Sequence, residues 1–179
     1  MRNLLIRALG SAGIGTVLCA TGCSHIPAAA PVNILEANPA TKTAQLFITA
    51  GYNSNNLWSN FDGYANGRLV VTIPVGYHVV LHFTNDGGIP YDLGVYTADN
   101  RVAFPGAGHS EQWLDMNPMA GVLPGDSQTY TFTASTAGTY RIASLLYRFP
   151  AHRPTHVALG MWDTLRVVKG GAPSAAVSR

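Results

Sequence analysis

Residues 68–84 have the sequence RLVVTIPVGYHVVLHFT, and this stretch decides the fold class of the chain. A Pro-Val-Gly turn at residues 74–76 separates two runs that are rich in β-branched side chains. In the second run Val79, Leu81 and Phe83 share one face, because alternate residues of a strand point to the same side. The pattern therefore predicts two β-strands, each with one face buried in a core.

The same pattern continues on both sides of this stretch. Short β-rich runs occur at residues 43–50, 93–97, 128–133, 138–146 and 161–168. Turn signals such as Asn66-Gly67 and Pro124-Gly125-Asp126 separate them, and no long amphipathic helical pattern is present. Seven or eight short strands of this kind predict an all-β sandwich or barrel. The segment Asn100–Leu123 is long and irregular, as functional loops often are.

The composition is typical of one folded domain, with 11% charged and 47% hydrophobic residues in a chain of 179. The net charge of +2 arises from Arg2 and Arg7 near the N-terminus. Because the remainder is neutral and has no basic stripe, we expect no nucleic-acid binding. The low content of carboxylates suits an acidic environment, since few groups become protonated as the pH falls.

Motifs of common enzyme classes are missing from the sequence. It contains no HExxH, GxSxG, GxGxxG or phosphate-binding loop. Ser144, His156 and Asp163 could be combined into a catalytic triad, but three such residues occur by chance in a chain of this length. We therefore expect no enzymatic activity.

The N-terminal residues 1–22 have the features of an export signal. A short basic start precedes an apolar stretch at residues 8–20, which is too short to predict a membrane span. The stretch ends in Ala-Thr-Gly before Cys23, which resembles a bacterial lipobox with Cys23 as the lipidated residue. The alternatives are ordinary cleavage nearby, which would release a periplasmic protein, and an uncleaved anchor segment.

Beyond the signal, the sequence divides into three parts. Residues 23–40 are rich in Ala and Pro and predict a tether, residues 41–169 form the folded domain, and residues 170–179 predict a flexible tail. Both cysteines, Cys19 and Cys23, lie in or beside the signal. The folded domain therefore has no disulfide, no thiolate nucleophile and no cysteine-based metal site.

Four stretches of the domain resemble sulfocyanin, a member of the cupredoxin family of small blue-copper proteins. They lie at residues 60–85, at 89–93, at 123–127 with 136–140, and at 156–162. The resemblance implies a cupredoxin-like Greek-key β-sandwich of seven to eight strands. It also implies a copper ion at one end, held in the family by two His, one Cys and a weak axial Met.

Two of the four ligand positions of the family are substituted in this chain. His156 matches the C-terminal histidine and Met161 the axial methionine. Ser144 stands where the family has its cysteine, and Tyr91 stands where it has its first histidine. A blue-copper centre depends on a copper–thiolate bond, which a serine hydroxyl cannot replace. We therefore expect no type 1 copper, with Ser144 and Tyr91 acting as hydrogen-bonding groups.

Two groups of residues could bind copper in another way, and each also has an interpretation without metal. His156 and Met161 could bind copper weakly with an imidazole from His152 or His109; alternatively, His156 lies at a partner surface and Met161 in the core. Residues 113–119, WLDMNPM, could form a Cu(I) cradle of two thioethers beside an indole if His109 or His152 lies nearby. The alternative is hydrophobic packing of a long loop.

Together these features predict an exported protein of a respiratory electron-transfer or copper-handling system. We expect it to lack a type 1 centre and to act by binding a respiratory or copper-handling membrane protein. One alternative is a periplasmic copper carrier that uses His156, Met161 and a further histidine. Another is a one-electron copper carrier. The expected cofactor is copper of another type, or none.

Overall fold

The computed structural model describes residues 34–117, 119–146 and 154–178. These residues belong to one compact unit, Val32–Arg179. The predicted export signal, Cys23 and His152 lie outside the described residues. Within the described ranges, no helix is long and apolar enough to cross a membrane.

One layer of the fold is a four-stranded sheet in the order β1-β2-β4-β6. Its strands are β1 (Leu35–Asn38), β2 (Thr43–Ala50), β4 (His78–Asn85) and β6 (Ser127–Thr133). β2 and β4 pair in parallel, while β1 and β6 pair antiparallel to their neighbours.

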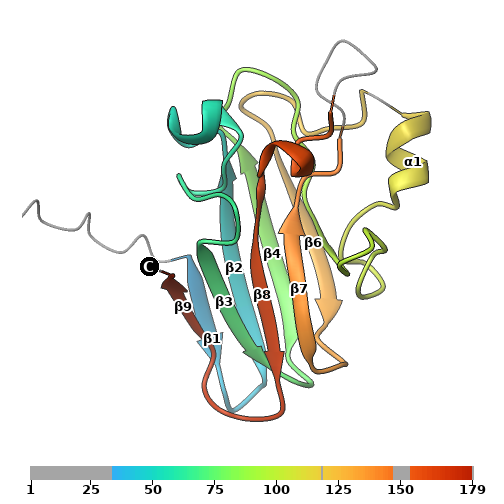
Figure 1. The fold of residues 1–179 in the computed structure, drawn as a ribbon. Helices are drawn as coiled ribbons and strands as arrows, with labels where there is room; N and C mark the ends of the chain where they lie inside the picture. The colour runs from blue at the N-terminus through green and yellow to red at the C-terminus, as the bar shows by residue number, and fades with distance from the viewer. Residues whose placement is uncertain (1–33, 118, 147–153, 179) are drawn as a thin grey trace, which may run out of the picture. The chain divides into compact units, whose positions relative to one another are not determined.

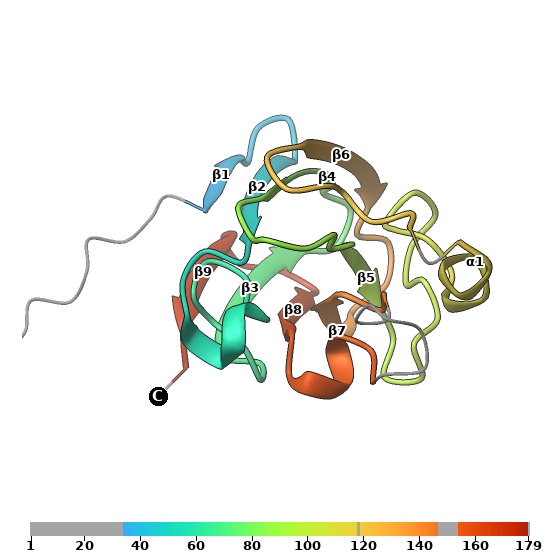
Figure 2. The ribbon, with the colours of Figure 1, turned by 90° about the horizontal axis from the view of Figure 1, so that it is seen from above.

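The second layer is a five-stranded sheet in the order β5-β7-β8-β3-β9. Its strands are β5 (Gly94–Tyr96), β7 (Gly138–Ala143), β8 (Trp162–Val168), β3 (Leu69–Pro74) and β9 (Ser174–Val177). The two sheets face each other as the layers of a sandwich (Figure 1), and the end-on view shows the layers clearly (Figure 2). The all-β sandwich expected from the sequence is therefore confirmed, with nine strands in the described part of the chain.

The stretch that decided the fold class joins the two sheets. β3 pairs with β8 and β9, whereas β4 pairs with β2 and β6, so the turn at residues 74–76 carries the chain from one layer to the other. Val79, Leu81 and Phe83 are fully buried between the layers, as their alternation predicts.

The strands extend beyond the limits expected for the folded part. β1 lies inside the predicted tether at residues 23–40, and β9 lies inside the predicted tail at residues 170–179. Both expectations need correction: β1 pairs with β2, and β9 pairs with β3. Their side chains are mostly exposed, so no buried face marks these strands in the sequence.

The described residues also form three short helical segments: η1 (Asn55–Trp58), α1 (Glu111–Met116) and η2 (Val157–Leu159). η1 and η2 lie at the same end of the sandwich (Figure 1), where the Asn56 side chain donates to the Leu159 carbonyl at 2.9 Å. α1 belongs to the long segment Asn100–Leu123 and lies outside the sheets beyond β5 (Figure 2). The expected irregular loop thus contains one short helix.

Candidate functional site

The four positions singled out in the sequence belong to segments that are joined at one end of the sandwich. Ser144 follows β7, His156 precedes η2 and Met161 precedes β8. The Val157 amide donates to the Ser144 carbonyl at 2.8 Å, and the Met161 amide donates to the His156 carbonyl at 3.0 Å. Gly160, with φ of 90°, forms the left-handed turn that leads from η2 into Met161. Ser144, His156 and Met161 are fully buried, and Tyr91 is 1% exposed.

A chain of three buried polar side chains forms the centre of this site. The Ser144 hydroxyl donates to Oδ1 of Asp92 at 2.6 Å. The same Oγ lies 2.9 Å from Nδ1 of His156. Because the serine proton is directed to Asp92, the second bond requires a proton on Nδ1, which donates to Oγ. Ser144 therefore links the carboxylate to the imidazole.

Asp92 is the residue of this site that the sequence analysis missed. Its carboxylate also accepts from the Leu146 amide at 2.8 Å and from the Leu145 amide at 3.4 Å. Burial raises the pKa of Asp92 above its ordinary value, while the bonds from Ser144, Leu146 and Leu145 oppose that rise. A lone acidic residue inside the apolar run around residue 93 was the signal that could have revealed it.

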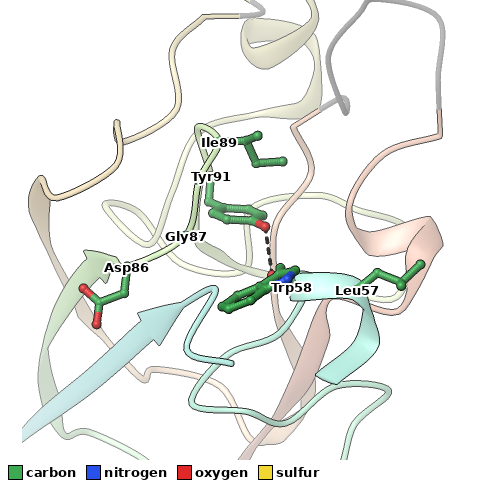
Figure 3. A pocket seen from close by; sticks show the side chains of 7 residues that line it. Leu57, Trp58, Asp86, Gly87, Ile89 and Tyr91 are labelled. Atoms are coloured by element: carbon green, nitrogen blue, oxygen red, sulfur yellow. Dashed lines mark hydrogen bonds between the residues drawn. The ribbon is translucent and has the colours of Figure 1, made fainter. Parts of the chain in front are cut away.

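Tyr91 covers the imidazole side of the centre. Its ring centroid lies 4.8 Å from that of His156, with the planes tilted by 51°. The Tyr91 hydroxyl donates to the Trp58 carbonyl at 2.8 Å, and it points to that residue in Figure 3. Tyr91 therefore connects the buried centre with the turn of η1. The hydrogen-bonding role expected for Tyr91 matches this geometry.

An open groove of about 460 Å³ lies on the outer side of Tyr91 (Figure 3). It is lined by Leu57, Trp58, Asp86, Gly87, Gly88, Ile89 and Tyr91. Leu57 is 76% exposed and Trp58 is 50% exposed, so the groove has an apolar and accessible rim. This surface lies directly beside the buried centre.

The remaining predicted site residues lie elsewhere. The His109 ring stacks on Trp113 with ring centroids 4.1 Å apart, and only its backbone carbonyl approaches the centre, through a bond from the Tyr96 hydroxyl at 3.0 Å. His152 cannot be placed, because it lies outside the described residues. Among the described residues, no group of three or more His, Cys, Asp or Glu side chains could hold a metal ion.

One alternative from the sequence is wrong, and the triad that the sequence analysis rejected finds no support in the structure. His156 is fully buried, so it is not an imidazole at a partner surface. Asp163 accepts from the Leu69 amide at 2.9 Å, so it does not complete a triad with Ser144 and His156. In a catalytic triad the serine hydroxyl donates its hydrogen bond to the histidine, whereas here the Ser144 hydroxyl donates to Asp92. The arrangement does not activate the serine as a nucleophile.

The donors present at the four positions do not fit a blue-copper centre. Such a centre requires a thiolate and two imidazoles in a trigonal plane. Here the corresponding groups are the Ser144 hydroxyl, the His156 imidazole and the Tyr91 phenol, and the sequence from Ser24 onward contains no cysteine. An ion placed between Ser144 and His156 would have to displace the Nδ1 proton that joins them.

Two facing sheets with a polar centre at one end define this protein as cupredoxin-like. The Sulfocyanin (SoxE) domain model matches residues 30–174, which is most of the chain. The protein therefore belongs to the sulfocyanin family, as the resemblance in the sequence indicated. Copper-related electron transfer is the activity that this family implies. No curated protein sequence matches the chain.

Solved structures of copper proteins have a similar fold. A multicopper oxidase from Campylobacter jejuni, described as a metallo-oxidase, is 13% identical with a TM-score of 0.51 over 75% of this chain and 28% of its own. A multi-copper oxidase from Pediococcus acidilactici is 14% identical with a TM-score of 0.50 over 75% and 27%. Auracyanin from Roseiflexus castenholzii is 19% identical with a TM-score of 0.45 over 74% and 99%. This chain thus spans less than a third of these two oxidases, and the likeness concerns the fold alone.

Proposed function

We propose that this protein is an exported sulfocyanin-family component of a copper-dependent electron-transfer system that has no type 1 copper of its own. It acts by binding a respiratory or copper-handling membrane protein. Export follows from the signal at residues 1–22, with Cys23 as the proposed site of a lipid tether. The proposed role is not enzymatic.

The hydrogen-bonded centre carries this proposal. Ser144 Oγ lies 2.6 Å from Asp92 and 2.9 Å from His156, so two of the family's ligand positions, Ser144 and His156, are hydrogen-bonded to each other. A buried polar network of this kind stabilises one arrangement of the loops that contribute to it. The function of the scaffold would then lie in presenting the surface above the centre.

The groove beside Tyr91 supports a partner-binding role. Leu57 and Trp58 expose large apolar side chains at its rim, and accessible aromatic residues of this kind often anchor protein interfaces. The bond from Tyr91 to the Trp58 carbonyl fixes this rim to the core. The proposed partner contact is therefore rigid and lies at the same end as the centre.

The lack of type 1 copper can be tested by restoring the missing ligands. We expect the Cu(II)-loaded natural protein to show no intense thiolate-to-copper absorption in the visible range, whereas Tyr91→His/Ser144→Cys gains one. Such a band in the natural protein would overturn the proposal.

Partner binding needs a separate experiment. Crosslinking of the tethered protein in its own membranes should recover a respiratory or copper-handling component. Trp58→Ala should reduce that yield, whereas Val177→Ala, an exposed change on β9, should not. Recovery that is equal for both variants would place the contact elsewhere and contradict the role of the groove.

A copper-carrier function is the second candidate, and one observation favours it. His156 and Met161 are both buried and are joined by a backbone hydrogen bond, so an imidazole and a thioether lie in one short loop. This donor pair suits Cu(I). If it binds, equimolar Cu(I) must raise the melting temperature, and Met161→Leu must abolish that rise. No shift in melting temperature would exclude this candidate.

A further inference from the structure

The helix α1 presents an unusual set of side chains outside the sheets. Trp113 is 41% exposed, Met116 75% and Met119 64%. On the opposite side of the helix, Leu114 is 1% exposed and attaches the helix to the core. Exposed thioethers can serve as ligands for soft metals or as apolar contacts. A further metal-binding group beside the helix, such as an imidazole, favours the role as ligands.

The His109 imidazole adjoins Trp113, the aromatic residue of this helix. Its ring lies on Trp113 with centroids 4.1 Å apart and planes within 16°. The backbone fixes both residues: the Tyr96 hydroxyl donates to the His109 carbonyl at 3.0 Å, and the Trp113 amide donates to the Ser110 hydroxyl at 3.2 Å. The stack is therefore held in place by neighbouring residues.

The stack has a specific consequence for a bound cation. A metal ion on an imidazole nitrogen lies in the plane of that ring. Because the imidazole plane is almost parallel to the indole and about one ring thickness above it, the ion would lie at a similar height over the Trp113 surface. A cation within about 6 Å of an indole face is stabilised by the ring quadrupole.

The two thioethers follow the indole along the chain. Met116 is three residues after Trp113 and so lies on the same face of α1, and helical side chains of this length point back toward the N-terminus. After the helix, Asn117 donates from its side chain to the Trp113 carbonyl at 2.8 Å and turns the chain. Met119 lies in that turn.

We propose that His109, Met116 and Met119 form a surface Cu(I) site over Trp113. One imidazole with two thioethers is a soft donor set that favours Cu(I) over zinc or calcium. The site is separate from the Asp92–Ser144–His156 centre and does not depend on the function proposed above. It corresponds to the cradle considered at residues 113–119, with the nearby histidine that this interpretation required.

The test is an anaerobic titration of the full chain with Cu(I), with Ag(I) as a redox-inert substitute, followed by tryptophan fluorescence. One equivalent should quench part of the emission. His109→Ala and Met116→Leu/Met119→Leu should each weaken binding by roughly tenfold or more, as expected for loss of a ligand. His78→Ala, which removes an exposed histidine of β4, is the matched control and should leave the affinity unchanged.

Trp113→Leu separates the role of the indole from that of the ligands. It should remove the quenching and weaken binding by only about two- to fivefold, which corresponds to a cation–π contact at an exposed site. Circular dichroism of each variant checks that the fold is retained. Unchanged affinity in His109→Ala or in the double methionine variant would overturn the proposal, and so would the absence of binding in the natural protein.

Discussion

At the residue scale, Ser144 is the side chain on which the centre depends. Its hydroxyl donates a hydrogen bond to Asp92 and accepts one from Nδ1 of His156, so each neighbour has Ser144 as a hydrogen-bond partner. Ser144→Ala should lower the free energy of unfolding by about 1–3 kcal/mol, because a buried carboxylate and an imidazole N–H each lose a partner. Denaturant unfolding measures this change.

The matched control is Ser127→Ala on β6. Ser127 also makes a side-chain hydrogen bond, to Thr84 at 3.1 Å, but it is exposed to solvent. Water replaces the lost partner there, so the expected change is within about 0.5 kcal/mol. If the two serine substitutions lowered the free energy of unfolding equally, the buried network would contribute no more to stability than an exposed hydrogen bond.

The sequence predicted part of this centre. The resemblance assigned Tyr91, Ser144, His156 and Met161 to the four ligand positions of the family. Asp92 was not predicted, because a single carboxylate has no periodic pattern and the donors of its two short hydrogen bonds, Ser144 and Leu146, are 52 and 54 residues away in the chain. Only the tertiary structure shows that Asp92 accepts the hydrogen bond of the Ser144 hydroxyl.

At the element scale, the turn of η1 contains an unusual backbone. Asn56, Leu57 and Trp58 have φ values of 50°, 54° and 66°, a left-handed conformation that costs non-glycine residues about 1–2 kcal/mol each. Asn60 stabilises the turn by donating to the Asn53 and Asn55 carbonyls at 2.8 and 2.6 Å. This strain shapes the rim of the groove.

Leu57→Gly tests the strain directly. The side chain is 76% exposed, so relief of the left-handed strain should outweigh the greater chain entropy of glycine and raise stability by up to about 1 kcal/mol. Leu123→Gly is the control, at an exposed leucine without positive φ, and should lower stability by about 0.5–1 kcal/mol. In thermal unfolding, Leu57→Gly should raise the melting temperature and Leu123→Gly should lower it. If both substitutions lowered it, Leu57 would not be strained.

The edge strands show the limit of pattern reasoning at this scale. β3, β4 and β6 have one buried face each and were predicted from alternation. β1 and β9 contribute backbone hydrogen bonds with little side-chain burial, so their sequences resemble a tether and a tail. Pairing with β2 and β3 creates these strands, and no local signal specifies it.

A chain ending at Lys169 provides a test. It lacks β9 and leaves the edge of β3 unpaired, so we expect the free energy of unfolding to fall by about 1–3 kcal/mol, given about 1 kcal/mol for each net hydrogen bond. A chain that lacks only Arg179 is the control. Equal stability of the two chains would mean that β9 contributes no stability.

At the scale of the whole molecule, buried acids link stability to pH. Burial raises the pKa of Asp62 to about 7 and that of Asp163 to about 8 from an ordinary value of 3.8. Asp62 accepts from the Thr49 amide at 3.2 Å and Asp163 from the Leu69 amide at 2.9 Å, while the second oxygen of each has no hydrogen-bond partner among the described residues. The protonated forms are therefore favoured in the fold.

A carboxyl whose pKa is raised by folding binds its proton more tightly in the folded state. Its contribution to stability is fully present below about pH 4 and is lost as the pH rises through 7 to 8. Denaturant unfolding between pH 4 and pH 8 should therefore show stability that decreases as the pH rises. This agrees with the acidic environment expected from the low charge content.

The double variant Asp62→Asn/Asp163→Asn tests whether these two carboxyl groups cause the decrease in stability with rising pH. A neutral amide imitates the protonated acid, so the slope of stability against pH should become smaller in this variant. Asp99→Asn is the control, because Asp99 is exposed and its pKa is lowered rather than raised. Stability that increases from pH 4 to pH 8 in the natural protein would contradict the account.

A proton on Nδ1 of His156 joins this imidazole to Ser144 at two of the family's ligand positions. Nitrogen-15 NMR of the histidine side chains tests it most directly, in the presence and absence of one equivalent of Cu(II). We predict a slowly exchanging Nδ1–H signal of His156 that disappears in Ser144→Ala and is unchanged by copper in the natural protein. A His156 imidazole without this proton, or one whose signal is lost when copper binds, would contradict the account.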